Sequence, residues 1–337
     1  AANNTAVGKN SLYSNTTGGN NTASGWQSLF TNTTGAENTA VGLNSLYSNT
    51  TGTENAAVGR SALESNTTGS YNVSLGKGTL ETNTTGASNT AVGTNSLQNA
   101  TTASNNTAVG MSALTANTTG DRNTAVGSGA ADSLTTGAAN TALGYKAMDV
   151  HTTGNSNTAV GAYALDANTT AGDNTAVGSS ALTTNTTGAS NTAAGTGALG
   201  ANTTASNNTA VGASAGAANT TGNENTFVGN VAGTAVTTGA DNTFIGSEAG
   251  DGTDDGASNV AVGKSALSGN CGDGNTAVGL EALTVCTGST NTAMGKNAGN
   301  AVTSGSNNLF VGLDSGKTGS PGGNQTTGSN QLALGDE

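Results

Sequence analysis

The residue types that most often carry chemistry are scarce in this chain of 337 residues, which has one histidine, His151, and two cysteines, Cys271 and Cys286. A zinc site of the usual kind needs three or four cysteine and histidine ligands, so the composition excludes it. A Ser-His-Asp triad would depend on His151 alone, and we interpret that residue as a solvated substitute for an asparagine of the repeat described below. We therefore expect no enzymatic activity and no cofactor.

Three acidic residues form the densest cluster of candidate metal ligands. Asp251, Asp254 and Asp255 fall within one turn, and oxygen-rich turns can bind Ca²⁺. Backbone carbonyls and water would have to complete the coordination shell, so a solvated acidic loop is the favoured interpretation. The other acidic residues are scattered, whereas enzymes that cleave glycans need paired carboxylates.

A repeat of 17 residues must supply the elements that position these side chains. Its consensus is N-T-A-V-G-x-x-A-L-x-x-N-T-T-G-x-x, numbered here as positions 1 to 17, and position 1 recurs every 17 residues from Asn4 to Asn259. Looser copies follow at Asn275, Asn291, Asn308 and Asn330. Asparagine at position 1 and glycine at position 5 form the structural ladder, which begins with Asn4, Gly8, Asn21, Gly25, Asn38 and Gly42. Such strict periodicity predicts stacked coils rather than the disorder that the composition alone would suggest.

The repeat predicts an all-β fold. A unit of this length is too short for a pair of helices, and glycine, threonine and asparagine are poor helix formers. Two short strands per unit, separated by turns, fit better. We therefore expect a parallel β-solenoid, or β-roll, of about 20 coils stacked at about 4.8 Å. Residues 1–258 would form the regular solenoid and 259–316 its irregular continuation, and 317–337 an insert containing Pro321 with a terminal repeat, a cap or the start of a further region.

Differences among the copies predict how the coils pack. Positions 2 and 4 should point to the same side of a strand and position 3 to the other. Position 3 is usually alanine but is Phe227, Phe244 or Phe310 where position 9 is glycine in the same and a neighbouring coil. This exchange of volume predicts that positions 3 and 9 share one packed layer. Because one coil buries few apolar side chains, we expect one strand face to pack against another chain in a homotrimer.

Positions 13 and 14 carry a pair of threonines in most coils. The resulting edge ladder begins with Thr16, Thr17, Thr33, Thr34, Thr50 and Thr51. Stacked threonine rows would suit an ice-binding face, but adjacent residues of a strand face opposite ways, so a hydrogen-bonded ladder is the favoured interpretation. The same N-T-T sequence is a glycosylation sequon. Acceptors one coil apart would crowd branched sugars, so only sparse modification is compatible with the spacing.

The two cysteines lie in consecutive, slightly shortened coils. Aligning both at position 13 places them one coil apart, within the Cα separation that a disulfide accepts. The sequence therefore predicts a Cys271–Cys286 disulfide, with two buried free thiols as the alternative.

Charge and hydropathy restrict the partners. The formal net charge of −12 disfavours nucleic acid, which requires a basic surface. The chain has no run of 18 apolar residues, so we expect no membrane insertion in this segment.

The repeat itself resembles known families. N-(T/S)-A-(V/I)-G-x-x-(A/S) is similar to the head repeat of trimeric autotransporter adhesins, and the longer unit with N-T-T-G is similar to repeats of phage tail-fibre and bacterial tail-fibre-domain proteins. The resemblance implies a left-handed trimeric β-roll located outside the cell or on a virion surface. We expect a non-enzymatic fibre shaft or adhesin whose partner is a host cell-surface glycan or protein. An ice-binding β-solenoid using threonine ladders and a glycosylated surface filament are the alternatives.

Overall fold

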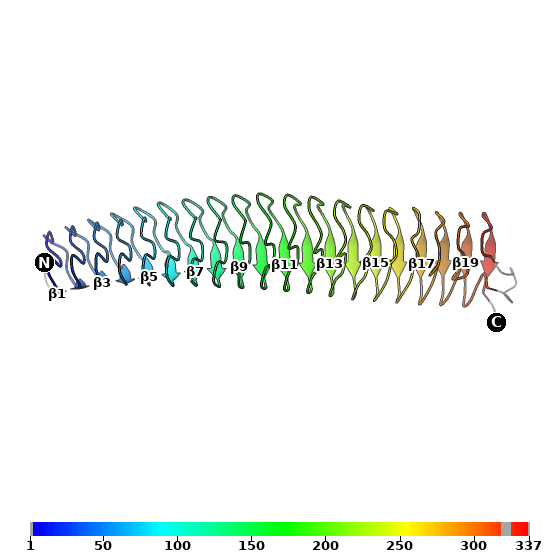
Figure 1. Ribbon diagram of the computed structural model, residues 1–337, viewed down its shortest axis with the longest axis horizontal. Coiled ribbons are helices and arrows are strands. Elements are labelled where there is room, and N and C mark those ends of the chain that lie inside the picture. Colours follow the sequence, from blue (N-terminus) through cyan, green and yellow to red (C-terminus); the bar gives the residue numbers. More distant parts are fainter. Residues whose placement is uncertain (1–2, 318–324, 336–337) are drawn as a thin grey trace. The chain divides into compact units, whose positions relative to one another are not determined.

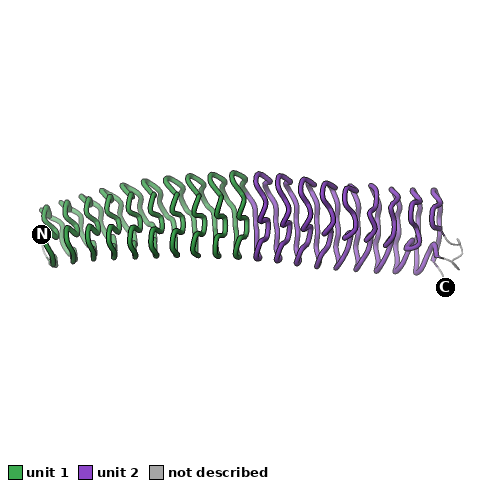
Figure 2. Tube along the Cα trace, viewed as in Figure 1, with its two compact units in different colours: residues 1–172 green, residues 173–337 purple. Residues whose placement is uncertain are grey.

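The computed structural model describes residues 3–317 and 325–335, which form 20 short parallel strands. The chain divides into two compact units, residues 1–172 and 173–337 (Figure 2). The sequence-based division at residues 258 and 316 marked changes of regularity, and the structure divides the chain elsewhere. The predicted insert lies partly outside the described residues, since Pro321 falls within 318–324.

The first unit contains one strand of three residues in each coil (Figure 1). These strands are β1 (Thr5–Val7), β2 (Thr22–Ser24), β3 (Thr39–Val41), β4 (Ala56–Val58), β5 (Val73–Leu75), β6 (Thr90–Val92), β7 (Thr107–Val109), β8 (Thr124–Val126), β9 (Thr141–Leu143) and β10 (Thr158–Val160). Consecutive strands pair in parallel with like positions opposed, so that Thr5 lies opposite Thr22. This arrangement confirms the predicted β-solenoid.

The second unit repeats the arrangement. Its strands are β11 (Thr175–Val177), β12 (Thr192–Ala194), β13 (Thr209–Val211), β14 (Thr226–Val228), β15 (Thr243–Ile245), β16 (Val260–Val262), β17 (Thr276–Val278), β18 (Thr292–Met294), β19 (Leu309–Val311) and β20 (Leu332–Leu334). In the last copy, Leu332 lies opposite Leu309, and Gln331 donates its backbone N–H to Asn308 Oδ1 at 2.9 Å. Gln331 therefore occupies position 1, which the sequence analysis had assigned to Asn330.

Each coil has one strand rather than the two predicted, because left-handed backbone conformations bend the remainder. Ordinary residues adopt positive φ at positions 7, 9 and 17, as at Asn10 (62°), Leu12 (50°) and Asn20 (60°). At position 5, Gly8 has φ of 125°, and a Cβ there would lie 2.5 Å from the carbonyl oxygen of Gly25. The expectation that this glycine serves both positive φ and close backbone approach is confirmed.

The core confirms the predicted layer of positions 3 and 9. Ala23 and Leu29 are fully buried in the second coil. In the second unit, the Phe310 ring occupies the space that a side chain would need at Gly299 and Gly316, where an added Cβ would lie 2.8 and 2.7 Å from the ring. Large and small residues at these positions therefore compensate one another.

Two ladders of buried asparagines connect the coils. At position 1, Asn21 Nδ2 donates to the Gly35 carbonyl at 2.9 Å, and Asn21 Oδ1 accepts the backbone N–H of Asn38 at 2.9 Å. At position 12, Asn32 Nδ2 donates to Asn15 Oδ1 and to the Gly35 carbonyl, both at 2.9 Å. Because buried amides cost free energy unless their hydrogen bonds are made, these ladders fix the register of each coil on the next.

Candidate functional site

His151 occupies position 12 and is fully buried, so the expectation of a solvated side chain is wrong. Its ring nitrogens lie within hydrogen-bond distance of two backbone carbonyls, Nδ1 at 3.1 Å from Asn168 O and Nε2 at 2.9 Å from Gly154 O. Burial lowers the pKa of His151, although the two carbonyl contacts oppose this shift. The residue substitutes for an asparagine in the position-12 ladder, as the sequence analysis inferred.

The three acidic candidates for Ca²⁺ do not assemble a site. Asp254 and Asp255 are exposed and Asp251 is half-buried. The Thr237 hydroxyl donates to Asp254 Oδ1. Within residues 3–317 and 325–335, no three histidine, cysteine or acidic side chains are placed to hold a metal ion. The Ca²⁺ candidate is therefore wrong, because these carboxylates spread along the turn instead of converging.

Cys271 and Cys286 are both buried and free, so the structure does not contain the predicted disulfide. Cys286 occupies position 12 rather than 13, because its backbone N–H donates to Leu283 O at 3.3 Å as position 12 does in other coils. The Cys271 thiol donates to the backbone oxygen of Cys286 at 2.9 Å. A hydrogen bond between the two thiols and burial raise the pKa of Cys271, and the same bond lowers the pKa of Cys286. This is the alternative of two buried thiols.

The threonine pair divides its roles as the sequence predicted. Thr33 is half-buried and its hydroxyl donates to Thr50 O at 2.9 Å, whereas Thr34 is exposed. Only one threonine per coil therefore faces outward along this edge. The adjoining asparagines of the sequons, such as Asn32 and Asn49, are fully buried and use Nδ2 as a hydrogen-bond donor. Because Nδ2 is the atom that would carry a glycan, this geometry disfavours the glycosylated filament.

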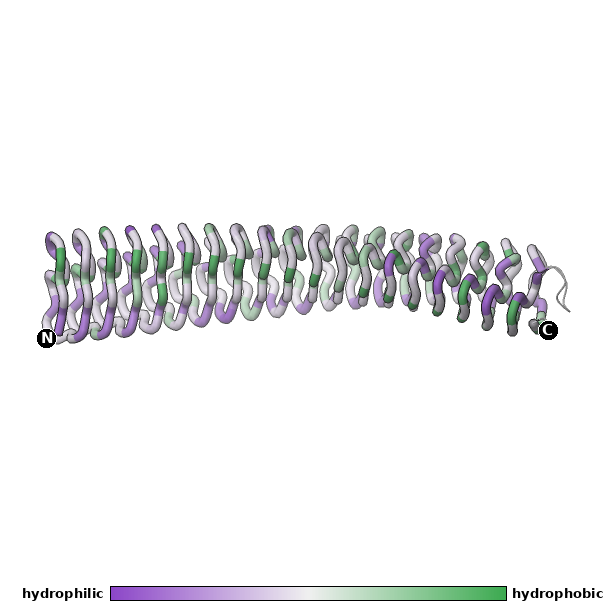
Figure 3. Tube along the Cα trace, turned by 90° about the horizontal axis from the view of Figure 1, so that it is seen from below, coloured by the Kyte–Doolittle hydropathy of each residue, from purple (hydrophilic) through white to green (hydrophobic). Residues whose placement is uncertain are grey.

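A continuous uncharged surface covers the strands, and we call it the outer sheet face. It consists of the side chains at positions 2 and 4, which point away from the core, as at Thr39 and Val41. No charged residue occurs at these positions in any of the 20 described strands. Apolar and polar segments recur once per coil in the hydropathy view (Figure 3). The prediction that positions 2 and 4 share one side is confirmed.

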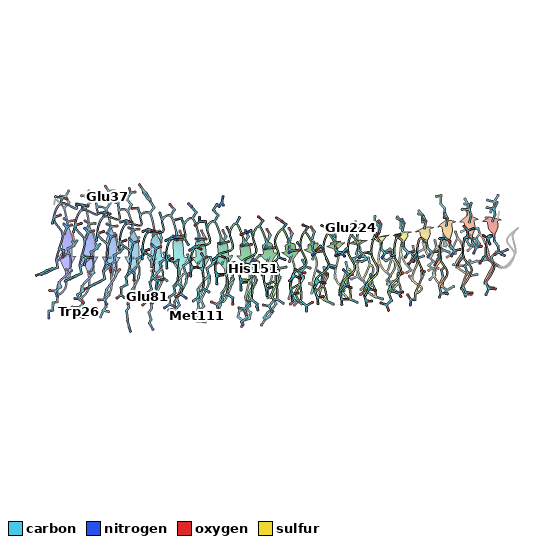
Figure 4. The ribbon with its side chains drawn as sticks, turned by 90° about the horizontal axis from the view of Figure 1, so that it is seen from above. Trp26, Glu37, Glu81, Met111, His151 and Glu224 are labelled. Atoms are coloured by element: carbon cyan, nitrogen blue, oxygen red, sulfur yellow. The ribbon has the colours of Figure 1, made fainter. Side chains whose placement is uncertain are left out.

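A second surface, at one edge of the first unit, escaped the sequence analysis. It is formed by side chains at positions 6, 7 and 10, and Trp26, Glu81 and Met111 project from it (Figure 4). We call it the aromatic edge, because six aromatic residues lie on it, namely Tyr13, Trp26, Phe30, Tyr47, Tyr145 and Tyr163. The signal that could have found it was the 17-residue spacing of Tyr13, Phe30 and Tyr47 at position 10.

Comparison with family models and with curated proteins finds no match for this chain. In the described residues, no helix combines the length and apolar character needed to cross a membrane.

Proposed function

We propose that the protein is a non-enzymatic structural component of an extracellular or virion-surface fibre, a shaft or adhesin that associates with copies of itself through the outer sheet face. The observation that carries this proposal is the uncharged character of that face along both units, in a chain whose net charge is −12. Apolar side chains such as Leu75 and Met294 are about half exposed there. Exposed apolar surface of this extent is typical of a protein interface.

The dimensions of the face suit an interface between copies. Ten strands at about 4.8 Å, each about 10 Å long, give roughly 500 Å² in one unit. A standard interface buries about 800 Å² on each partner, so each unit supplies more than half of that area. Identical faces brought together would bury apolar rows without burying charge, which favours a homotrimer of parallel chains as the resemblance implies.

The oligomeric state of the full chain tests this proposal. Light scattering coupled to size exclusion should report the mass of three chains of 32.0 kDa. Combining Val109→Glu with Val211→Glu places one carboxylate on the outer sheet face of each unit and should yield monomers, because an unpaired charge would be buried at the interface. Thr119→Glu with Thr221→Glu adds the same charge at position 14 and should leave the trimer intact. A monomeric native chain would overturn the proposal.

Ice binding is the second candidate, and one observation favours it. The T-A-V strand places threonine and valine on the same flat side, as at Thr107 and Val109, whereas the Thr16–Thr17 type of pair gives a single outward row. An ice-binding solenoid would therefore use the outer sheet face and not the edge ladder. Thermal hysteresis of the native chain, reduced by Val109→Glu, would support this second function.

A further inference from the structure

The aromatic residues of the first unit are gathered on one edge. Seven of the ten aromatic residues lie in this unit, and none of the seven is fully buried. Six of them lie on the aromatic edge, whereas Tyr71 occupies position 17, the position from which Glu37 projects at the opposite edge (Figure 4). In the second unit, Phe227, Phe244 and Phe310 are all in the core. The aromatic edge is therefore a local feature and not a property of the repeat.

Three of these rings form a stack across the first three coils. The centroids of Tyr13 and Phe30 are 5.2 Å apart with planes within 6°, and those of Phe30 and Tyr47 are 5.2 Å apart with planes within 2°. These distances fall in the range of offset stacking, which leaves part of each ring uncovered. Tyr13 is 71% exposed and Trp26 is 47% exposed. Apolar ring surface is thus presented to solvent at each successive coil.

Two further rings lie on the same edge with charged groups around them. The Tyr145 and Tyr163 centroids are 5.4 Å apart with planes at 87°. Beside them, Lys146 Nζ forms an ion pair with Asp149 Oδ2 at 2.9 Å. Burial raises the pKa of Asp166, and the nearby Asp149 raises it further. Aromatic surface and hydrogen-bonding groups therefore alternate along the edge.

Each aromatic group adjoins a buried oxygen that accepts no hydrogen bond. Asn44 Oδ1, three residues before Tyr47, and Asp166 Oδ1, three residues after Tyr163, have no partner. Asn44 Nδ2 donates to Glu64 Oε1 at 3.3 Å, which directs that side chain along the aromatic edge. A buried acceptor without a donor costs free energy. These two oxygens therefore favour a ligand that brings hydroxyl donors.

The charges on the aromatic edge nearly balance. Positions 6, 7 and 10 of the first unit carry four basic residues, Lys9, Arg60, Lys77 and Lys146, and five acidic residues, Glu64, Glu81, Asp132, Asp149 and Asp166. Such a surface gives no electrostatic preference for a polyanion or a polycation. The chemistry that it recognises is therefore neutral.

We propose that the aromatic edge binds a neutral, extended β-linked polysaccharide, an inference that rests on the proposed role as an adhesin. The apolar face of a pyranose ring packs on aromatic rings, and its hydroxyls would donate to Asn44 Oδ1 and Asp166 Oδ1. An extended glycan chain has a sugar repeat close to the coil spacing, so successive sugars meet successive coils. Many weak contacts along one chain would combine into useful avidity.

Affinity gel electrophoresis of the full chain, with hydroxyethylcellulose in the gel, tests this proposal. The native chain should be retarded, and Trp26 fluorescence should change on titration with the same polymer. Tyr47→Ala and Tyr163→Ala should each weaken binding about tenfold. Tyr71→Ala, an exposed aromatic outside the aromatic edge, should change affinity less than about twofold. Asn44→Leu retains the size of the side chain and removes the acceptor, so it should weaken binding with little effect on the ring stack.

Three results would overturn the proposal: no retardation of the native chain, equal losses in Tyr71→Ala and Tyr47→Ala, or retardation by dextran sulfate alone. Circular dichroism of each variant separates lost binding from lost folding. Light scattering on the same samples keeps the two proposals apart. A trimer that ignores the polymer would contradict only the polysaccharide proposal, whereas a monomer that binds it would contradict only self-association.

Discussion

The two units build the same coil but place their aromatic residues on opposite sides of the backbone. In the first unit, position 9 is leucine in most coils and aromatic rings such as Phe30 lie at the surface. In the second unit, Phe227 and Phe244 fill the core where Gly233 and Gly250 stand at position 9. The solenoid therefore fixes the volume of each layer and leaves open which position supplies it.

The difference extends to charge. Residues 1–172 contain five basic and eight acidic residues, whereas residues 173–337 contain three basic and twelve acidic residues. The first unit thus combines a nearly balanced surface with exposed rings, and the second combines an acidic surface with a core that contains rings. The first unit is equipped to bind a neutral ligand, and the second is better suited to a purely structural role.

The largest expected effect tests where the phenylalanines contribute. Phe227→Ala should lower the free energy of unfolding by about 3–5 kcal/mol, because it leaves a cavity in the core. Phe30→Ala should cost only about 0.5–1.5 kcal/mol, the value of a surface aromatic contact. Urea unfolding followed by circular dichroism would measure both.

A compensating variant sharpens the same comparison. Adding Gly216→Leu and Gly233→Leu to Phe227→Ala recreates the layer of the first unit, because Leu199 already adopts the required φ of 49° at position 9. Most of the lost stability should return. If the triple variant were no more stable than Phe227→Ala alone, compensation between positions 3 and 9 would be wrong.

The strict period was sufficient to predict the solenoid and the layer shared by positions 3 and 9, since both follow from spacing and volume. It could not reveal the single strand per coil, because Leu12 and Ser61 adopt positive φ, which their residue types do not signal. Nor could it show that Asn32 is buried, since asparagine is usually exposed and becomes tolerable inside only through the ladder. The aromatic edge depends on which positions project together, which requires the fold.

A smaller effect concerns the position-12 ladder, which is more complete in the first unit. It is interrupted at Ala100, and Asn83 Oδ1 in the preceding coil has no hydrogen-bond partner. Ala100→Asn should supply the missing donor and stabilise the protein by about 0.5–1.5 kcal/mol. Ala116→Asn makes the same change outside the ladder and should not stabilise. A thermal melt that ranks the two variants equally would contradict the contribution of the ladder.

The smallest effect depends on pH and again belongs to the first unit. Burial lowers the pKa of His151 below its ordinary value of 6.5. The unfolded chain therefore binds a proton near pH 6.5 that the folded chain does not, and stability falls as the pH decreases below that value. His151→Asn restores the ladder residue and removes the titrating group, so it should lose less stability than the native chain on acidification. Between pH 6.5 and 5.5 the difference can reach at most about 1.4 kcal/mol. Parallel acid-dependent losses in the two proteins would show that His151 remains able to bind its proton in the folded ladder, with both carbonyls accepting from an imidazolium.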